Sequence, residues 1–349
     1  MIDLSKQTQT TGDHSTAVQA TNVTIIQQSD RTQIEAVARD VIRRELETLT
    51  AQAGATFQTR AETLVSGFIE KLSTSSTFDF RKVEDPRFQF ALHEAQKGYG
   101  KDGSAQLKDE LTSLLVRIGS ESRDEVAKLY AEAINVVPLL TAAQVKAIAV
   151  VCAARSLTFR PSTIEQLTDN FKSQVFPFVD GAARSSFDFN HIEYARCGQV
   201  GMGSFTLWSV VQQNYPGLFS KGFSAEAIPP TLGENVRQQL IIPCLNDPAL
   251  LQVNALHINT LEERAKLLGL QKAEIESLTN LFNVNRMSEP EIIALLETRD
   301  PRFKQLADYL QTTAASRLLL TSVGVIIGVV NVENISGTTV NLSGWFSAG

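Results

Sequence analysis

The chain has 349 residues, of which 43% are hydrophobic and 20% are charged, a composition typical of a soluble globular protein. Its length exceeds that of one typical hydrophobic core and predicts two packed subdomains. The net charge is −6, and no block of Lys and Arg residues occurs. These two features exclude a general electrostatic footprint for nucleic acid, so nucleic-acid binding is not expected.

The first 29 residues are predicted to form a β leader. Their start lacks the charged and apolar blocks of a signal peptide, which favours a cytoplasmic protein. Thr, Gln, Asn and Val recur around one Gly12-Asp13 turn, a composition typical of short strands. The apolar residues Val18, Val23 and Ile25 are the candidates for strand pairing in this leader.

A long amphipathic helix is predicted to follow the leader. Apolar residues recur in steps of three and four from Ile34 to Leu72, and Asp30 with Gln33 forms a capping signal. An unbroken helix of this length would span about 60 Å, unless Gly54 bends it. Such a helix needs a coiled-coil-like partner, from this chain or from another copy.

Shorter helices follow, each with its own boundary signal. Asp85-Pro86 and Asp300-Pro301 are typical of helix starts, and Pro138 is expected to end a helix. Thr141 with Gln144 and Ser162 with Glu165 predict two further N-terminal caps. We assign residues 30–158 and 159–316 to two helical domains.

The last 33 residues, 317–349, are predicted to form a β-rich tail. The apolar run 318–332 is too short for a typical membrane span and is rich in β-branched residues. It is therefore expected to be a buried strand, or a short helix that breaks into a strand. Residues 337–346 alternate in polarity and predict a strand, with Val340, Leu342 and Trp345 as pairing residues.

The sequence contains few motifs that are typical of catalytic, metal or cofactor sites. Three cysteines without a C-x-x-C pair, and four histidines without zinc-ligand spacing, predict no disulfide framework and no metal site. No cofactor motif occurs either, because the glycines at 198–203 lack the Lys of a P-loop. His191, Glu193 and Cys197 are the nearest approach to a catalytic group, so an enzyme stays open as an alternative.

A loop rich in glycine, proline and aromatic residues follows the middle helices. Tyr215, Leu218 and Phe219 in this loop are candidates for contact with a partner protein. A loop packed into the core is the alternative interpretation of the same residues.

Three segments together resemble an uncharacterised bacterial family: residues 12–20, residues 85–97 with their Asp-Pro-Arg-Phe-Gln start, and residues 321–324 leading to the Trp345 tail. Gly-Asp-Ser-Gln leaders of this kind resemble those of bacterial proteins suspected in conflict with phages. The resemblance implies a cytoplasmic role in phage defence, and it transfers no catalytic residue. The Gly- and Ser-rich end at 345–349 departs from the family pattern.

These observations predict a mainly α fold, a multi-helix body with short β-strands at the N- and C-termini. Isolated terminal strands need pairing partners, either each other or the same strands of neighbouring copies. The leading hypothesis is a homo-oligomeric interaction protein, with a phage or host protein as a further partner. Deleting residues 1–29 is expected to change its mass. The alternatives are an enzyme around His191 and a membrane-active effector that exposes residues 318–332.

Overall fold

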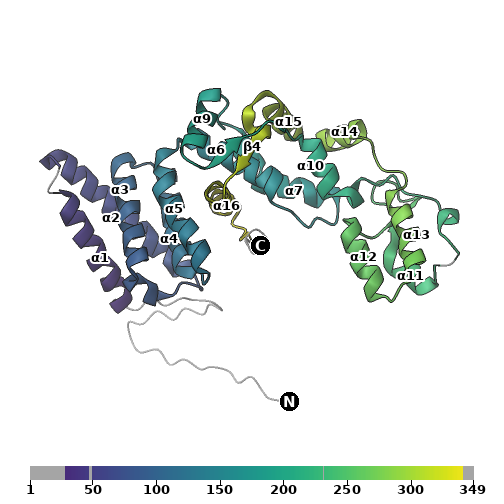
Figure 1. Cartoon of the computed structure of the whole chain (residues 1–349), viewed down its shortest axis with the longest axis horizontal. Coiled ribbons are helices and arrows are strands. Elements are labelled where there is room, and N and C mark those ends of the chain that lie inside the picture. Colours follow the sequence, from purple (N-terminus) through teal and green to yellow (C-terminus); the bar gives the residue numbers. More distant parts are fainter. Residues whose placement is uncertain (1–27, 47–48, 231, 341–349) are drawn as a thin grey trace, which may run out of the picture.

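The computed structural model describes residues 28–46, 49–230 and 232–340. Within these ranges the fold is mainly α, which confirms the predicted class. The molecule is elongated, with one bundle of helices at the N-terminal end and a small helical lobe at the opposite end (Figure 1). The predicted leader residues Val18, Val23 and Ile25, and the tail residues Leu342 and Trp345, lie outside the described residues.

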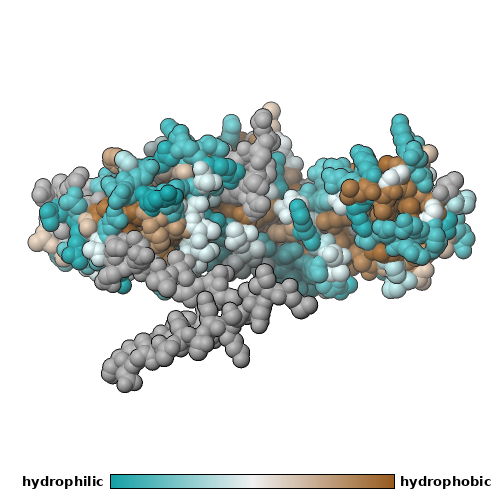
Figure 2. All heavy atoms as spheres, turned by 90° about the horizontal axis from the view of Figure 1, so that it is seen from below, coloured by the Kyte–Doolittle hydropathy of each residue, from teal (hydrophilic) through white to brown (hydrophobic). Residues whose placement is uncertain are grey.

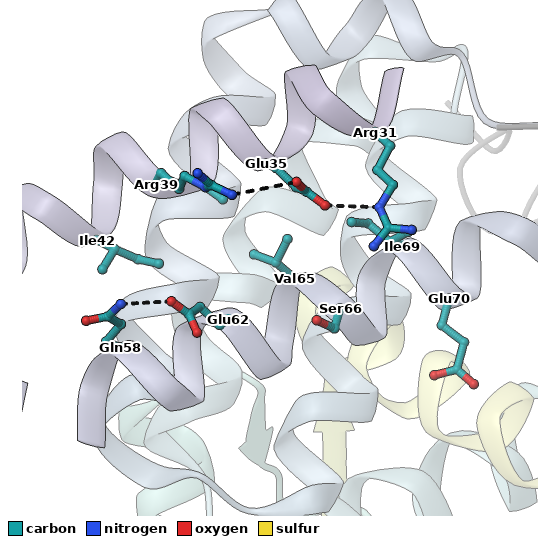
Figure 3. Close-up of a pocket in the computed structure, with 11 residues that line it drawn as sticks. Arg31, Glu35, Arg39, Ile42, Gln58, Glu62, Val65, Ser66, Ile69 and Glu70 are labelled. Atoms are coloured by element: carbon teal, nitrogen blue, oxygen red, sulfur yellow. Dashed lines mark hydrogen bonds and ion pairs between the residues drawn. The ribbon is translucent and has the colours of Figure 1, made fainter. Parts of the chain in front are cut away.

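The N-terminal bundle contains five helices: α1 (Gln28–Leu46), α2 (Ala51–Thr74), α3 (Pro86–Asp102), α4 (Ala105–Ser120) and α5 (Asp124–Val136). The prediction of one continuous helix from Asp30 was wrong, because α1 and α2 run antiparallel, side by side (Figures 1 and 3). Their apolar faces bury each other, and Ile42, Phe57 and Ala61 form a small cluster between them. The partner of the amphipathic pattern is therefore found within this chain.

Helix starts follow the local signals. Asp85 caps α3 by accepting a hydrogen bond from the N–H of Arg87 at 2.8 Å. Thr141 and Gln144 form the predicted reciprocal capping box at the start of α6 (Ala142–Val151). In α7 (Ile164–Gln174) the cap is Thr163, one residue after the predicted Ser162.

The remaining elements alternate short helices with very short strands. In chain order they are η1 (Phe80–Glu84), η2 (Val137–Leu139), η3 (Cys152–Ser156), α8 (Phe176–Val179), α9 (Ser186–Tyr194), β1 (Gly198–Val200), α10 (Leu207–Asn214), η4 (Pro216–Phe219), η5 (Ala225–Ala227), α11 (Glu234–Leu240), β2 (Ile241–Pro243), β3 (Leu251–Val253), α12 (Ile258–Leu267), α13 (Lys272–Asn283), α14 (Glu289–Arg299), α15 (Arg302–Thr312), η6 (Ala314–Arg317), β4 (Leu318–Leu320) and α16 (Ser322–Ser336). β1 pairs antiparallel with β4, and β2 with β3. Of the described strands, β4 lies within the predicted tail, residues 317–349, whereas β1, β2 and β3 lie in the middle of the chain.

The segment predicted as a β-rich tail contains the central helix of the fold. β4 covers only Leu318–Leu320, and α16 then runs through residues that are buried from Val323 to Val332. A helix that is apolar on all sides is stable only when it is surrounded, and α16 packs against α4, α5 and α6 (Figure 1). The strand predicted for residues 318–332 is therefore limited to Leu318–Leu320, and most of this run is helical. No helix in the described ranges is long and apolar enough to cross a membrane.

The core is organised differently from the predicted domains. One large cluster of buried side chains joins the N-terminal bundle, α16 and the helices around α7 and α15. A second, smaller core lies in the end lobe and is formed by Phe223, Leu232, Leu240, Val253, Leu261, Leu278, Leu281 and Phe282. Figure 2 shows hydrophobic atoms reaching the surface of that lobe. The large cluster extends across the predicted boundary at residue 158, because α16 packs on helices from both sides of it.

Candidate functional site

An open groove lies between the antiparallel helices α1 and α2 (Figure 3). Its volume is about 690 Å³. Five lining residues come from α1 and six from α2: Arg31, Glu35, Ala38, Arg39 and Ile42, then Gln58, Glu62, Val65, Ser66, Ile69 and Glu70. On each helix these positions follow steps of three and four, which place side chains in one stripe along the helix. Two stripes thus face one another across the groove.

The floor of the groove is apolar. Ala38, Ile42 and Val65 are buried, and Ile69 is half-buried at the edge of the main core. Apolar side chains at the bottom of an open groove can contact another molecule without a change in the fold. The floor therefore offers an apolar contact area, and the polar and charged residues of the two walls determine which molecule can bind to it.

The α1 wall of the groove is basic. Arg31 Nε lies 3.0 Å from Glu35 Oε1, and an Arg39 guanidinium nitrogen lies 3.9 Å from Glu35 Oε2. Glu35 thus lies close to both arginines, and the two positive charges and one negative charge give this wall a net charge of about +1. Both arginines are largely solvent-exposed, so these pairs add little to stability and remain available for another contact.

The α2 wall is acidic. Gln58 Nε2 donates a hydrogen bond to Glu62 Oε1 at 2.9 Å. Neither Glu62 nor Glu70 forms an ion pair with any residue that the structure describes. Figure 3 shows the Glu70 carboxylate directed away from the arginines of α1. The two walls of one groove therefore carry opposite charge.

The predicted pairing residue Val340 makes a contact inside its own chain. Its N–H donates to Glu333 Oε1 at 2.8 Å, and its side chain packs against the main core. Residues 337–340 form no strand. The described part of the tail is therefore anchored on the end of α16.

The predicted partner loop is packed into the core. Tyr215, Leu218 and Phe219 are all buried, and Tyr215 Oη accepts a hydrogen bond from the N–H of Phe159 at 3.2 Å. The aromatic and apolar side chains of this short 3₁₀ turn fill the space beside α10. They offer no free surface to a partner, and the alternative of a packed loop is the one that the structure shows.

The three residues of the enzyme alternative have separate structural partners. His191 Nδ1 lies 3.1 Å from Gln144 Oε1, and Glu193 Oε1 accepts a hydrogen bond from the Val200 N–H at 2.6 Å. Cys197 is fully buried, and this burial raises the pKa of its thiol to about 12. A thiol with such a pKa is protonated at neutral pH and is a poor nucleophile.

No group of three or more His, Cys, Asp and Glu side chains that could hold a metal ion occurs within the described ranges. The residues that form the groove walls were missed by the sequence analysis. Their signal was present, since Arg31, Glu35 and Arg39 follow a step of four, as do Gln58 and Glu62.

A protein-family model described as ":-like" matches residues 30–346 of the chain. This match covers the groove, the central helix and the end lobe. No curated protein and no solved structure matches the chain.

Proposed function

We propose that this chain, which belongs to the family whose model it matches, is a cytoplasmic, helical interaction protein that assembles with copies of itself. The observation that carries this proposal is the groove between α1 and α2, with one basic and one acidic wall above an apolar floor. A surface that contains both signs of charge in parallel stripes is complementary to itself.

The occupant of the groove is a second copy of the chain. In a two-fold symmetric dimer the same surface meets itself, so the α1 wall of one copy faces the α2 wall of the other. Arg31 and Arg39 then meet the unpaired carboxylates Glu62 and Glu70 of the second copy. Four helices, two from each copy, would form a bundle that buries the floor on both sides.

A single change on the floor tests this assembly. Ile69→Glu places a carboxylate where the second copy is expected to bury apolar surface, and Thr63→Glu places one on an exposed position of the same helix outside the groove. Light scattering over a range of concentrations should show a lower mass for Ile69→Glu only, with circular dichroism confirming that both variants fold. A wild-type chain that stays monomeric at every concentration would contradict the proposal.

Pairing of the terminal strands between copies is a separate route to the same oligomer. Removal of residues 1–27 distinguishes the two routes, because the groove lies entirely in the residues that remain. Assembly through the groove keeps the mass of the oligomer, whereas assembly through the leader loses it.

The cellular role that we propose for this assembly is defence against phages, which the resemblance of residues 12–20 and 85–97 supports. Plaque counts on cells with the wild-type gene, the Ile69→Glu gene and no gene test it. Fewer plaques are expected with the wild-type gene alone. Equal counts for all three strains over a broad phage panel would count against this role.

The two alternatives gain no support from the geometry. The thiol of Cys197 is buried and protonated, and the apolar surface of α16 is already covered by α4, α5 and α6. A membrane-active form would have to remove α16 from the centre of the main core.

A further inference from the structure

A second surface, distant in sequence from the groove, exposes large apolar side chains on neighbouring elements. Phe187 and Tyr194 on α9 are 76% and 78% exposed, Met202 after β1 is 102% exposed, and Leu319 on β4 is 46% exposed. We call these residues and the elements that bear them the α9–β4 face. Large aromatic and Met side chains are enriched at protein interfaces and cost free energy when left in water.

The parts of the α9–β4 face are physically continuous. The Val200 N–H donates to Glu193 Oε1, which ties β1 to α9, and Gln199 is the cross-strand partner of Leu319. A Cβ at position 201 would lie 3.4 Å from Leu319 Cδ1, so the Leu319 side chain lies over Gly201, next to Met202. The strand β1 contacts both α9 and β4, and Figure 1 shows α9 and β4 in the same middle part of the elongated molecule.

The exposed charged side chains that flank these apolar residues are two arginines. Arg196 and Arg317 are exposed, and neither forms an ion pair with a residue in the described ranges. The nearby carboxylates of Asp188 and Glu193 keep their charge but are half-buried, and they accept hydrogen bonds within the chain, whereas the two guanidinium groups are exposed. On a chain with a net charge of −6, two free guanidinium groups beside an apolar surface favour an acidic partner.

The backbone holds Arg196 in place. Its φ of 59° lies in the left-handed region, which is uncommon for a residue with a Cβ. The conformation is held by a hydrogen bond from the Arg196 N–H to the Glu193 carbonyl at 2.8 Å, and by one from Thr321 Oγ1 to the Arg196 carbonyl at 2.7 Å. The Arg196 side chain therefore starts from a fixed point between α9 and β4, as a preorganised contact requires.

We infer that the α9–β4 face binds an acidic amphipathic segment of a partner protein. The apolar side of that segment covers Phe187, Tyr194, Met202 and Leu319, and its carboxylates pair with Arg196 and Arg317. Arg and Tyr are among the residues that carry most of the binding energy of protein interfaces. This site is independent of the self-assembly groove, because no residue of the α9–β4 face lines that groove.

The probe is a dye-labelled synthetic helix with glutamates on one side and leucines and phenylalanines on the other, and binding to the full chain is followed by fluorescence anisotropy. Arg196→Glu/Arg317→Glu should weaken binding at least about tenfold, since it reverses both charge contacts. The matched control is Lys101→Glu/Lys272→Glu, which reverses two exposed charges elsewhere and should leave the affinity unchanged. A scrambled peptide of the same composition should bind weakly to all variants.

A second variant tests the apolar contacts of the α9–β4 face without changing its charge. Phe187→Ala/Tyr194→Ala removes two exposed rings and should lose peptide binding while keeping the unfolding midpoint of the wild type. The inference is overturned if the wild type does not bind the peptide, or if both double variants bind it as the wild type does. It is also overturned if a thymidine oligonucleotide displaces the peptide, or if the ring variant changes the mass of the oligomer, which would make the face a contact with nucleic acid or with a second copy.

Discussion

Gly324 at the start of α16 packs directly on the main-chain carbonyl of Cys197, so closely that an added Cβ would lie 1.8 Å from that oxygen. The same carbonyl accepts a hydrogen bond from the Thr321 N–H at 3.0 Å. The central helix is thus seated on the backbone just before β1, at the base of the α9–β4 face. A side chain at position 324 cannot be accommodated unless one of these two backbones moves.

The substitution Gly324→Ala should therefore destabilise the fold. Alanine favours a helix by up to about 1 kcal/mol over glycine, but the backbone clash outweighs that gain. We expect a net loss of about 1–3 kcal/mol in the free energy of unfolding, measured by urea denaturation. Gly203→Ala is the control, because a Cβ there meets no atom within 4 Å. Equal stability of both variants would show that α16 is not seated as described.

Glu110 makes the stability depend on pH. It is buried in α4, and this burial raises its pKa from 4.5 to about 7, against the opposing hydrogen bond from Gln106 Nε2 at 2.8 Å. Between these pH values the folded chain retains a proton that the unfolded chain has lost. The contribution of Glu110 to stability is therefore fully present below its unfolded pKa of 4.5 and is lost as the pH rises towards 7, by about 3 kcal/mol in all.

Glu110→Gln removes this titration while keeping the shape of the side chain. Urea unfolding of both proteins from about pH 5 to about pH 8 should give a difference in stability that grows in favour of the variant as the pH rises. The comparison cancels the contribution of His257, whose lowered pKa acts in the opposite direction over the same range. A difference that does not change with pH would mean that Glu110 does not titrate in this window.

Tyr215→Phe distinguishes a packed loop from a partner loop. The change removes the hydroxyl that accepts the buried N–H of Phe159 and leaves that N–H without a partner. A loss of about 1–3 kcal/mol in unfolding free energy is expected, with no change in the mass of the oligomer. A variant of full stability and reduced mass would restore the interpretation of this loop as a contact surface.

The thiols should be inert in the folded chain. Cys152, Cys197 and Cys244 are all buried, and burial raises the pKa of the first two to about 12. Mass spectrometry after brief iodoacetamide treatment at neutral pH should find little modification of Cys152 and Cys197 in the native protein and complete modification in urea. Rapid native labelling of Cys197 would revive the enzyme alternative.

The helix starts could be predicted because their causes are local. Asp85 and Thr141 each bond to an N–H within three residues, so sequence alone is sufficient. The break between α1 and α2 could not be predicted, because no Gly or Pro occurs from Leu46 to Ala51 and the break follows from the packing of two apolar faces. The same applies to α16, whose β-branched residues favour a strand until α4, α5 and α6 surround them.

The groove also depends partly on local sequence and partly on tertiary packing. The charged steps on α1 and α2 are visible in the sequence, but their opposition across a groove depends on the antiparallel pairing of the two helices. An unbroken helix would have placed Arg39 and Glu62 far apart. The candidate site therefore depends on the chain reversal after α1, which no Gly or Pro signals in the sequence.

The most direct measurement is the mass of two charge-swapped variants, separately and mixed. Arg31→Glu/Arg39→Glu makes both walls of the groove acidic, and Glu62→Arg/Glu70→Arg makes both walls basic. Light scattering should find each variant alone at the mass of a single chain, and an equimolar mixture at the mass of the wild-type oligomer, because only the mixture restores opposite charges across the interface. A mixture that stays at the mass of a single chain, beside a wild type that assembles, would contradict assembly through this groove.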